Sequence, residues 1–286
     1  STESDDIDMF ESLSSQYYSI VPCNFGKEKR LPNIDILDRY EELNCNLDAL
    51  EDIIMAGDVI KLSKSADSSI NPIDAIYNSL GVKLSMIDDD SEIFDIIKSW
   101  MRNTRGSTHS YKSMTPSIIY EVHSTNKIYE SKFGHYTNKT LLWHGTRMIN
   151  ILNIFKNGLI IKPSWSSHCG SAFGDGLYFA NSSSKSANYC RDGGDIILLI
   201  YEVALGNMCS STSGNFKVDK DITNGEYDSM HGVGKQTCDP DKDIYIDDVK
   251  IPIGPLIKTQ NSGYLEYDEF IVYDKDQVHL RYVVQL

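Results

Sequence analysis

Short connections between apolar segments are the feature that most constrains the fold of the second half of the chain. Strands are expected at residues 141–144, 176–180, 196–204, 269–274 and 277–285. Helices are expected near residues 147–157 and 183–191. A parallel pair of strands needs a crossover of about a dozen residues or more, and most of these connections are too short for a repeated crossover. The sequence therefore predicts an α+β fold that is mostly antiparallel, rather than a doubly wound sheet.

The segment before residue 141 adds further elements to this predicted domain. Residues 82–86 alternate between apolar and polar side chains as a strand does, and residues 118–123 read as a second strand. Ser91 is expected to begin a helix. The apolar face of that helix carries Ile93, Phe94, Ile97, Trp100 and Met101.

The first 62 residues read as helices. An apolar stripe at alternating steps of four and three predicts one helix after residue 33. The stripe consists of Ile36, Tyr40, Leu43, Leu47, Leu50 and Ile54. A shorter helix is expected around residues 7–18. Residues 62–69 are small and polar, which is typical of a linker. We therefore expect a truncated helical segment with its linker at residues 1–69 and a second domain at residues 70–286.

Charge and cysteine content exclude several classes of function. The formal net charge is −14 at pH 7, so the surface repels phosphate backbones and the chain is not expected to hold DNA or RNA by itself. The six cysteines are scattered without a CxxC pair, which argues against a zinc site or a disulfide scaffold and favours a reducing compartment. No apolar run reaches about 18 residues, so no membrane span is expected.

Residues 141–190 contain most of the candidate binding residues. An apolar run ends in His144 and Gly145, and a glycine lets a flat ligand approach the backbone closely. A strand backbone at Gly145 offers one N–H and one C=O, which match the donor and acceptor of a carboxamide. Ser186 could add a hydroxyl group. The alternatives are a glycine at a bulge, a serine that caps a helix, and a histidine in the core.

Five sequence blocks resemble the catalytic domain of the poly(ADP-ribose) polymerases, and they occur in the order that the family has. They are residues 143–147 (WHGTR), 173–180 (FGDGLYFA), 184–190 (SKSANYC), 202–207 (EVALGN) and 267–273 (YDEFIVY). Residues 1–62 resemble the later helices of the regulatory domain that precedes this catalytic domain. The resemblance implies a two-sheet ADP-ribosyltransferase-type fold after a partial all-helical domain, in a fragment of a larger protein.

The resemblance implies that NAD is the donor substrate. In the family, the residues that match Gly145 and Ser186 hold the carboxamide of nicotinamide. Tyr178 and Tyr189 would flank the cationic nicotinamide ring, a contact worth about 0.5–2 kcal/mol. His144 would donate a hydrogen bond to the 2′-hydroxyl of the adenine-side ribose. Further candidates for donor binding are Thr146, Arg147, Asn150, Phe179 and Ala180.

Glu269 is the candidate for the chemical step. Cleavage of the bond between nicotinamide and ribose builds positive charge on the sugar, and a fixed carboxylate stabilises that charge. With His144 and Tyr178, Glu269 matches the His-Tyr-Glu trio of relatives that form polymers. Lys185 matches a family lysine near this carboxylate and is a further catalytic candidate. The alternatives are a solvated glutamate at the start of a strand and an exposed helical lysine.

The loop at residues 162–175 departs from the family pattern. Ile160 stands near its start where relatives commonly carry arginine, Ser171 and Ala172 replace Tyr-Met, and Asp175 replaces a lysine. Ligands that stack on the missing tyrosine are therefore expected to bind differently.

Two acidic residues in the helical segment suggest regulation. Asp48 and Asp52 match positions that face the donor cleft in relatives. A negatively charged lid would oppose entry of a pyrophosphate, which gives a hypothesis of autoinhibition; the alternative is a solvated helix face.

We therefore predict an NAD-dependent protein ADP-ribosyltransferase that elongates poly(ADP-ribose) and needs no metal. Single-unit transfer, NAD hydrolysis and a non-catalytic module that binds NAD or ADP-ribose are the alternatives. The implied partners are protein acceptors including the chain itself, DNA through modules upstream of this chain, and an accessory protein at the acceptor side. The family also implies the nucleus and a role in DNA repair.

Overall fold

The computed structural model describes residues 12–16, 54, 57, 61, 71–109, 114–124, 133, 136–161, 172–190, 195–214 and 225–286. Residues 12–16 and residue 54 are helical, as expected, and the rest of the helices expected at 7–18 and 36–54 lie outside the described residues. The linker expected at 62–69 also lies outside them, so the domain boundary stays a prediction. The elements described below belong to one compact unit formed by residues 56–163 and 171–286.

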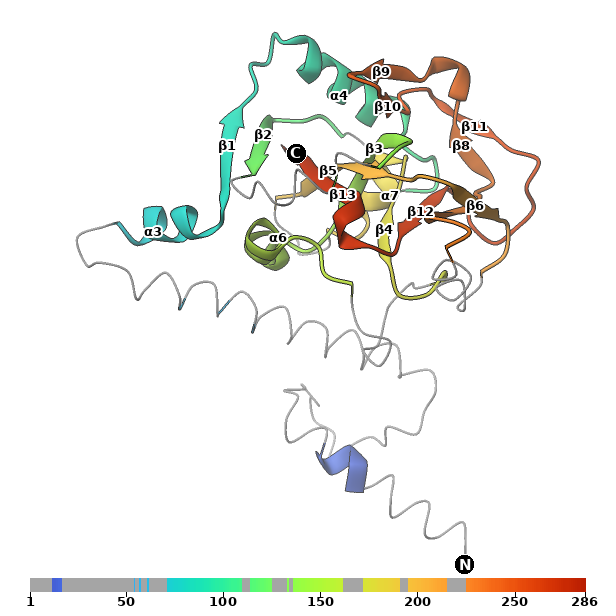
Figure 1. Cartoon of the computed structure of the whole chain (residues 1–286). Coiled ribbons are helices and arrows are strands. Elements are labelled where there is room, and N and C mark those ends of the chain that lie inside the picture. Colours follow the sequence, from blue (N-terminus) through green and yellow to red (C-terminus); the bar gives the residue numbers. More distant parts are fainter. Residues whose placement is uncertain are drawn as a thin grey trace, which may run out of the picture. The chain divides into compact units, whose positions relative to one another are not determined.

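The larger sheet has seven strands in the order β1-β2-β13-β5-β3-β10-β9 (Figure 1). Their bounds are β1 Val82–Met86, β2 Ile118–Ser124, β13 Val278–Gln285, β5 Ile197–Ala204, β3 Lys139–Gly145, β10 Val249–Ile251 and β9 Ile244–Ile246. Every neighbouring pair is antiparallel except β10 and β3, which pair in parallel. Strand β3, which ends in the candidate binding residues, therefore lies inside the sheet rather than at its edge.

A second sheet has four strands in the order β4-β12-β7-β6, and a two-stranded sheet pairs β11 with β8. Their bounds are β4 Leu177–Phe179, β12 Glu269–Val272, β7 Ser229–Gly232, β6 Met208–Ser211, β11 Leu256–Lys258 and β8 Gln236–Cys238. Trp143 of β3 and the residue after β4, Ala180, exchange two backbone hydrogen bonds of 2.8 and 3.0 Å, which join the two larger sheets. The predicted α+β, mostly antiparallel fold is confirmed.

The helices are short, apart from α4. Their bounds are α3 Pro72–Ser79, α4 Glu92–Asn103, η1 Met148–Asn150, α6 Ile151–Asn157, α7 Ser183–Ala187, η2 Pro240–Lys242 and η3 Lys275–Gln277. The hydroxyl of Ser91 caps α4 by accepting a hydrogen bond from the backbone N–H of Phe94, as the sequence predicts. Helix α3 was not predicted, although Asn71 caps it and Pro72 occupies its first turn.

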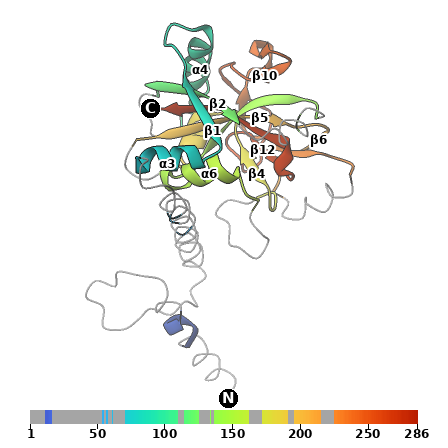
Figure 2. The same cartoon turned by 60° about the vertical axis from the view of Figure 1, so that its left-hand side comes forward.

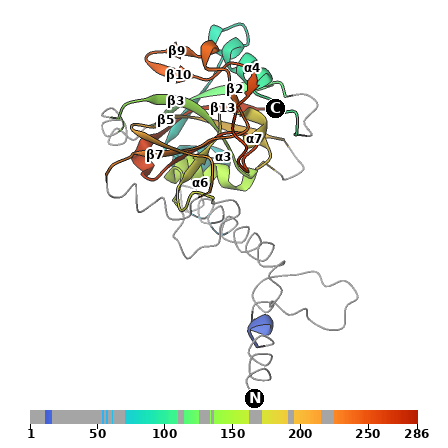
Figure 3. The ribbon, with the colours of Figure 1, turned by 90° about the vertical axis from the view of Figure 1, so that its right-hand side faces the viewer.

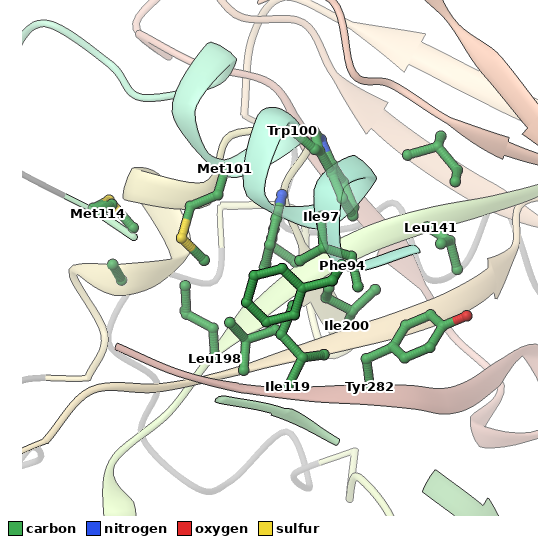
Figure 4. Packing of buried hydrophobic residues seen from close by; sticks show 14 of the residues in the cluster. Phe94, Ile97, Trp100, Met101, Met114, Ile119, Leu141, Leu198, Ile200 and Tyr282 are labelled. Atoms are coloured by element: carbon green, nitrogen blue, oxygen red, sulfur yellow. The ribbon is translucent and has the colours of Figure 1, made fainter. Parts of the chain in front are cut away.

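Two hydrophobic clusters cover the opposite faces of the large sheet. Phe94, Ile97 and Trp100 of α4 pack on one face (Figure 4). The ring centroids of Trp100 and Trp143 are 4.3 Å apart. Residues of α6 pack with β4 and β12 on the other face. Figure 2 shows α4 and α6 on opposite sides of the sheet, and Figure 3 shows β9 and β10 beside α4. Strand β3 is thus buried on both faces until it reaches His144.

Candidate active site

The end of β3 lies directly against α7. A Cβ atom placed on Gly145 would be 1.7 Å from the carbonyl oxygen of Ser186, so no residue with a side chain fits there without movement of the backbone. Pairing of Gly145 with Leu198 of β5 holds the other edge of the strand in register. The close contact with α7 therefore explains why a glycine occupies this position, in addition to the ligand contact expected from the sequence.

Ser186 is buried beside Gly145. Its Oγ donates a hydrogen bond of 3.0 Å to the backbone oxygen of Trp143. The residue that caps α7 is Ser182, whose hydroxyl accepts from the backbone N–H of Lys185, so the interpretation of Ser186 as a helix cap is wrong. To donate to a ligand carbonyl, the hydroxyl of Ser186 has to turn away from Trp143.

The protonation state of His144 is set by its neighbours. Nδ1 lies 3.0 Å from the carbonyl oxygen of Tyr178 and therefore donates to it. Burial lowers the pKa of His144, and the hydrogen bond to Tyr178 opposes that effect without cancelling it. The neutral ring consequently carries a lone pair on Nε2. A ribose hydroxyl would donate to that atom, which is the reverse of the direction that the resemblance implies.

The two tyrosines expected beside the nicotinamide ring differ in their surroundings. The hydroxyl of Tyr178 accepts from the backbone N–H of Phe173 at 3.0 Å and donates to the carbonyl of Gly174 at 2.8 Å. Burial is the main cause that raises the pKa of Tyr178, so its hydroxyl stays protonated. Tyr189 follows α7 and its side chain is 52% exposed. Tyr178 is thus fixed by a tight turn, whereas Tyr189 presents much of its ring to solvent.

Glu269 lies on the same face of the second sheet as Tyr178. Ile271 is the register partner of Tyr178, and Glu269 precedes Ile271 by two residues, so its side chain points to the same side. Oε1 of Glu269 lies 2.9 Å from Nζ of Lys185. Oε2 is buried and has no hydrogen-bond partner among the described residues. The structure therefore brings Tyr178, Lys185 and Glu269 together, with one carboxylate oxygen of Glu269 unpaired among the described residues.

Lys185 is largely buried, and its ammonium group has three acceptors. Besides Glu269, Nζ donates to the carbonyl oxygens of Tyr267 at 2.9 Å and Asp268 at 3.2 Å. Burial lowers the pKa of Lys185, and the charge of Glu269 opposes that effect. The interpretation of Lys185 as an exposed surface lysine is therefore wrong.

The remaining candidates for donor binding fall into two groups. Phe179 and Ala180 are buried; the ring of Phe179 has its centroid 5.6 Å from that of His144. Phe179 packs near the ring of His144, and Ala180 pairs with Trp143 of β3. Thr146 and Asn150 lie beyond the end of β3, where Nδ2 of Asn150 donates to Oγ1 of Thr146 at 2.9 Å. Arg147 lies between them and begins η1.

The divergent donor loop is described only in part. Ile160 is 47% exposed, and Ala172 and Asp175 lie in or next to the turn that Tyr178 holds. Ser171 lies outside the described residues, as do the acidic residues Asp48 and Asp52 of the autoinhibition hypothesis.

Two neighbours of the site have no signal in the sequence. Asp268 is buried beside Glu269, and the segment after α4 contacts α7, where Nδ1 of His109 lies 2.7 Å from Oγ of Ser184. The hydrogen bonds of Asp268 to Asn181 and of His109 with Ser184 join residues that are far apart in the chain, so no local pattern predicts them. Within the described part of the chain, no group of three His, Cys, Asp or Glu side chains is arranged to hold a metal ion. None of the described helices could cross a membrane.

Comparison with known proteins gives matches along nearly the whole chain. The family model of the poly(ADP-ribose) polymerase catalytic domain matches residues 91–286, and that of the poly(ADP-ribose) polymerase regulatory domain matches residues 2–77. A poly [ADP-ribose] polymerase of Drosophila melanogaster is 35% identical over 280 residues, which are 96% of this chain and 28% of the relative. Poly [ADP-ribose] polymerase 1 of Gallus gallus is 35% identical over 281 residues, 96% of this chain and 27% of the relative. Poly [ADP-ribose] polymerase 2 of Arabidopsis thaliana is 32% identical over 285 residues, 96% of this chain and 44% of the relative. The chain thus spans less than half the length of these relatives.

Proposed function

Because the chain belongs to the poly(ADP-ribose) polymerase family, we propose that it is an NAD-dependent protein ADP-ribosyltransferase. In the proposed reaction, the bond between nicotinamide and ribose breaks and nicotinamide leaves with the bonding electrons as a neutral molecule. A nucleophilic oxygen of the acceptor then bonds to the anomeric carbon, and a hydroxyl acceptor gives up its proton to the carboxylate of Glu269 or to water. Acceptors are side chains of proteins, including this chain, and the hydroxyl groups of ADP-ribose already attached.

The buried carboxylate of Glu269 is the observation that supports this proposal most strongly. Lys185 holds Oε1 at 2.9 Å, and Oε2 is left without a hydrogen-bond partner among the described residues. A polar atom that is buried without a partner costs free energy, so such an atom in a folded protein suggests that a ligand satisfies it. A fixed negative charge would also stabilise the positive charge that develops on the ribose, more in the transition state than in bound NAD.

The donor site in this proposal is built around the end of β3. Gly145 and Ser186 would hold the carboxamide, and the rings of Tyr178 and Tyr189 would flank the pyridinium. His144 would orient the adenine-side ribose by accepting a hydrogen bond at Nε2. Thr146, Arg147, Asn150, Phe179 and Ala180 would complete or support the donor site.

The proposed chemistry needs no metal to carry charge. Nicotinamide is positively charged in NAD and neutral after it leaves, so its departure requires no acid, and Glu269 lies beside the positive charge that remains on the sugar. NAD is consumed as a substrate rather than kept as a resident cofactor.

The partners and the location of the chain are part of the same proposal. The regulatory-domain match at residues 2–77 is consistent with control by DNA, which modules upstream of this chain would bind. An accessory protein at the acceptor side would complete the set of partners. The proposed location is the nucleus.

Product analysis tests the proposal. The chain is incubated with NAD labelled in the adenosine moiety, and its products are resolved on a denaturing gel beside those of Glu269→Gln. A ladder on the wild-type chain supports elongation to poly(ADP-ribose), and a single sharp band supports single-unit transfer. Free ADP-ribose alone indicates NAD hydrolysis, and no labelled product from the wild-type chain overturns the proposed activity.

A further inference from the structure

Asp268 is a buried carboxylate that the proposed chemistry does not use. Its side chain is 1% exposed and meets four partners. Oδ1 accepts from the backbone N–H of Gly234 at 2.8 Å and lies 3.4 Å from Nε2 of His231. Oδ2 accepts from Nδ2 of Asn181 at 3.0 Å and from the hydroxyl of Thr237.

These partners come from separate parts of the domain. Asn181 lies just before α7, His231 is in β7, Gly234 is in the turn after β7, and Thr237 is in β8. The side chain of Asp268 therefore ties the start of β12 to the segment before α7, to β7 with the turn after it, and to β8. Three hydrogen bonds, from Gly234, Asn181 and Thr237, therefore hold the buried carboxylate in place.

The backbone of Asp268 is tied to the same lysine that holds Glu269. Nζ of Lys185 donates to the carbonyl of Asp268 at 3.2 Å and to Oε1 of Glu269 at 2.9 Å. Asp268 directly precedes β12, and its side chain reaches the segment before α7, the turn after β7 and β8, while the side chain of Glu269 lies on the face of the sheet that carries Tyr178. A shift of the Asp268 side chain would move the Cα of Glu269 with it.

We propose that Asp268 is a positioning residue, whose buried side chain fixes the start of β12 and thereby holds the carboxylate of Glu269 at its place beside Lys185. This inference rests on the proposed function, in which Glu269 acts on the ribose. In this inference, the distance from Glu269 to the ribose depends on Asp268. The binding of nicotinamide at the end of β3 does not depend on Asp268.

The hydrogen-bond donors around Asp268 also explain why a carboxylate, rather than an apolar side chain, occupies this position. Burial on its own would raise the pKa of Asp268, but His231, Thr237 and the N–H of Gly234 outweigh burial and the pKa is lowered. An apolar side chain would leave these donors without an acceptor.

Two substitutions of Asp268 distinguish an effect on the position of Glu269 from an effect of the negative charge of Asp268. Asp268→Ala removes the acceptor, whereas Asp268→Asn keeps an oxygen for Gly234 and replaces Oδ2 by an NH₂ group of similar size. That group has acceptors available, because Oδ1 of Asn181 has no hydrogen-bond partner in the described part of the chain and the hydroxyl of Thr237 can rotate. Asp268→Asn should therefore preserve the geometry.

Glu202→Ala is the matched control for Asp268→Ala. Glu202 is 5% exposed and pairs with Arg281 and Lys139, away from the candidate site residues. Nicotinamide binding by calorimetry counts the folded sites of each variant, and kcat and KM for NAD are measured per folded site. The wild-type chain and Glu269→Gln are assayed in parallel.

Asp268→Ala should lower kcat about 100-fold and change KM for NAD by less than about threefold, because a displacement of about 1 Å can cost that much in rate. Asp268→Asn should retain kcat within about threefold, and Glu202→Ala should lose stability but not kcat per folded site. Folded Asp268→Ala with a kcat near that of the wild-type chain overturns the inference and leaves the proposed function standing. An equal loss of kcat in Asp268→Asn overturns it as well, since the effect would then follow the charge. An inactive wild-type chain overturns both.

Discussion

Nζ of Lys185 lies 2.9 Å from Oε1 of Glu269, and both side chains are largely buried. The pair joins helix α7 to strand β12, two elements that are distant in the sequence. Lys185 thus engages Oε1 of Glu269, whereas Oε2 is buried without a hydrogen-bond partner among the described residues. Strand β4, which carries Tyr178, lies next to β12 in the same sheet.

Removal of Lys185 should destabilise the fold and slow turnover. Lys185→Met leaves Glu269 as a buried charge without its counter-ion, which should lower the free energy of unfolding by about 3 kcal/mol. The double variant Lys185→Met/Glu269→Gln should lose less than the single variant, because no charge is then stranded. Urea unfolding of the wild type and both variants measures the coupling. Additive losses would show that the two side chains do not interact.

Gly145→Ala should damage both the fold and donor binding. The added Cβ would lie 1.7 Å from the carbonyl oxygen of Ser186, so α7 and β3 must separate. The expected cost is about 1–3 kcal/mol of stability, with the loss of most of the affinity for nicotinamide. Gly57→Ala is the control, because a Cβ there meets nothing within 4 Å. If Gly145→Ala and Gly57→Ala had the same free energy of unfolding and the same affinity for nicotinamide, the close contact of Gly145 with Ser186 would be contradicted.

The two tyrosine rings can be tested through Tyr189. Its side chain is 52% exposed, so Tyr189→Ala should change stability little. If the ring stacks on the pyridinium, Tyr189→Ala should raise KM for NAD roughly 2- to 30-fold, which corresponds to about 0.5–2 kcal/mol. Tyr189→Phe keeps the ring and should resemble the wild type. An unchanged KM in Tyr189→Ala would remove Tyr189 from the donor site.

Stability should fall as the pH drops below the ordinary pKa of histidine. Burial lowers the pKa of His144 in the folded state, and the unfolded chain has a pKa of about 6.5. Between these two values the unfolded state binds more protons, so the free energy of unfolding decreases as the pH falls from about 6.5 towards the lowered pKa. Burial, with the charge of Lys185, also lowers the pKa of His109, which adds to the same slope.

His144→Gln should therefore flatten the dependence of stability on pH below about 6.5. Urea unfolding at several pH values checks this. His109→Gln is measured in parallel and should remove the contribution of His109 to the same slope. A slope in His144→Gln equal to that of the wild type would mean that His144 is protonated to the same extent in the folded and unfolded states.

Local patterns account for the elements that could be predicted. Helix α4 shows its cap at Ser91 and an apolar face, and Phe94, Ile97, Trp100 and Met101 of that face are buried. Strands β1, β3 and β5 are apolar or alternating segments that the sequence predicts, although β3 begins two residues before the predicted start. The family resemblance, which the comparisons confirm, supplied the roles expected of Gly145, Ser186 and Glu269.

The features that were missed depend on contacts between distant residues. Strands β6 to β11 are three or four residues long, and pairing such as that of Met208 with Ser229 gives no periodic signal. The tautomer of His144 depends on the carbonyl of Tyr178, and the partners of Asp268 come from Asn181 and from residues 231–237, both distant from it in the sequence. Helix α3 is different, because Asn71 and Pro72 are a local start signal, although no helix was predicted there.

Release of nicotinamide from NAD tests the central claim most directly, because it reports cleavage of the glycosidic bond whatever the acceptor is. The wild-type chain should release nicotinamide, and Glu269→Gln should do so at least about 100-fold more slowly while it still binds nicotinamide. Release by Glu269→Gln at the wild-type rate would contradict the account, because the buried carboxylate would then have no part in the reaction.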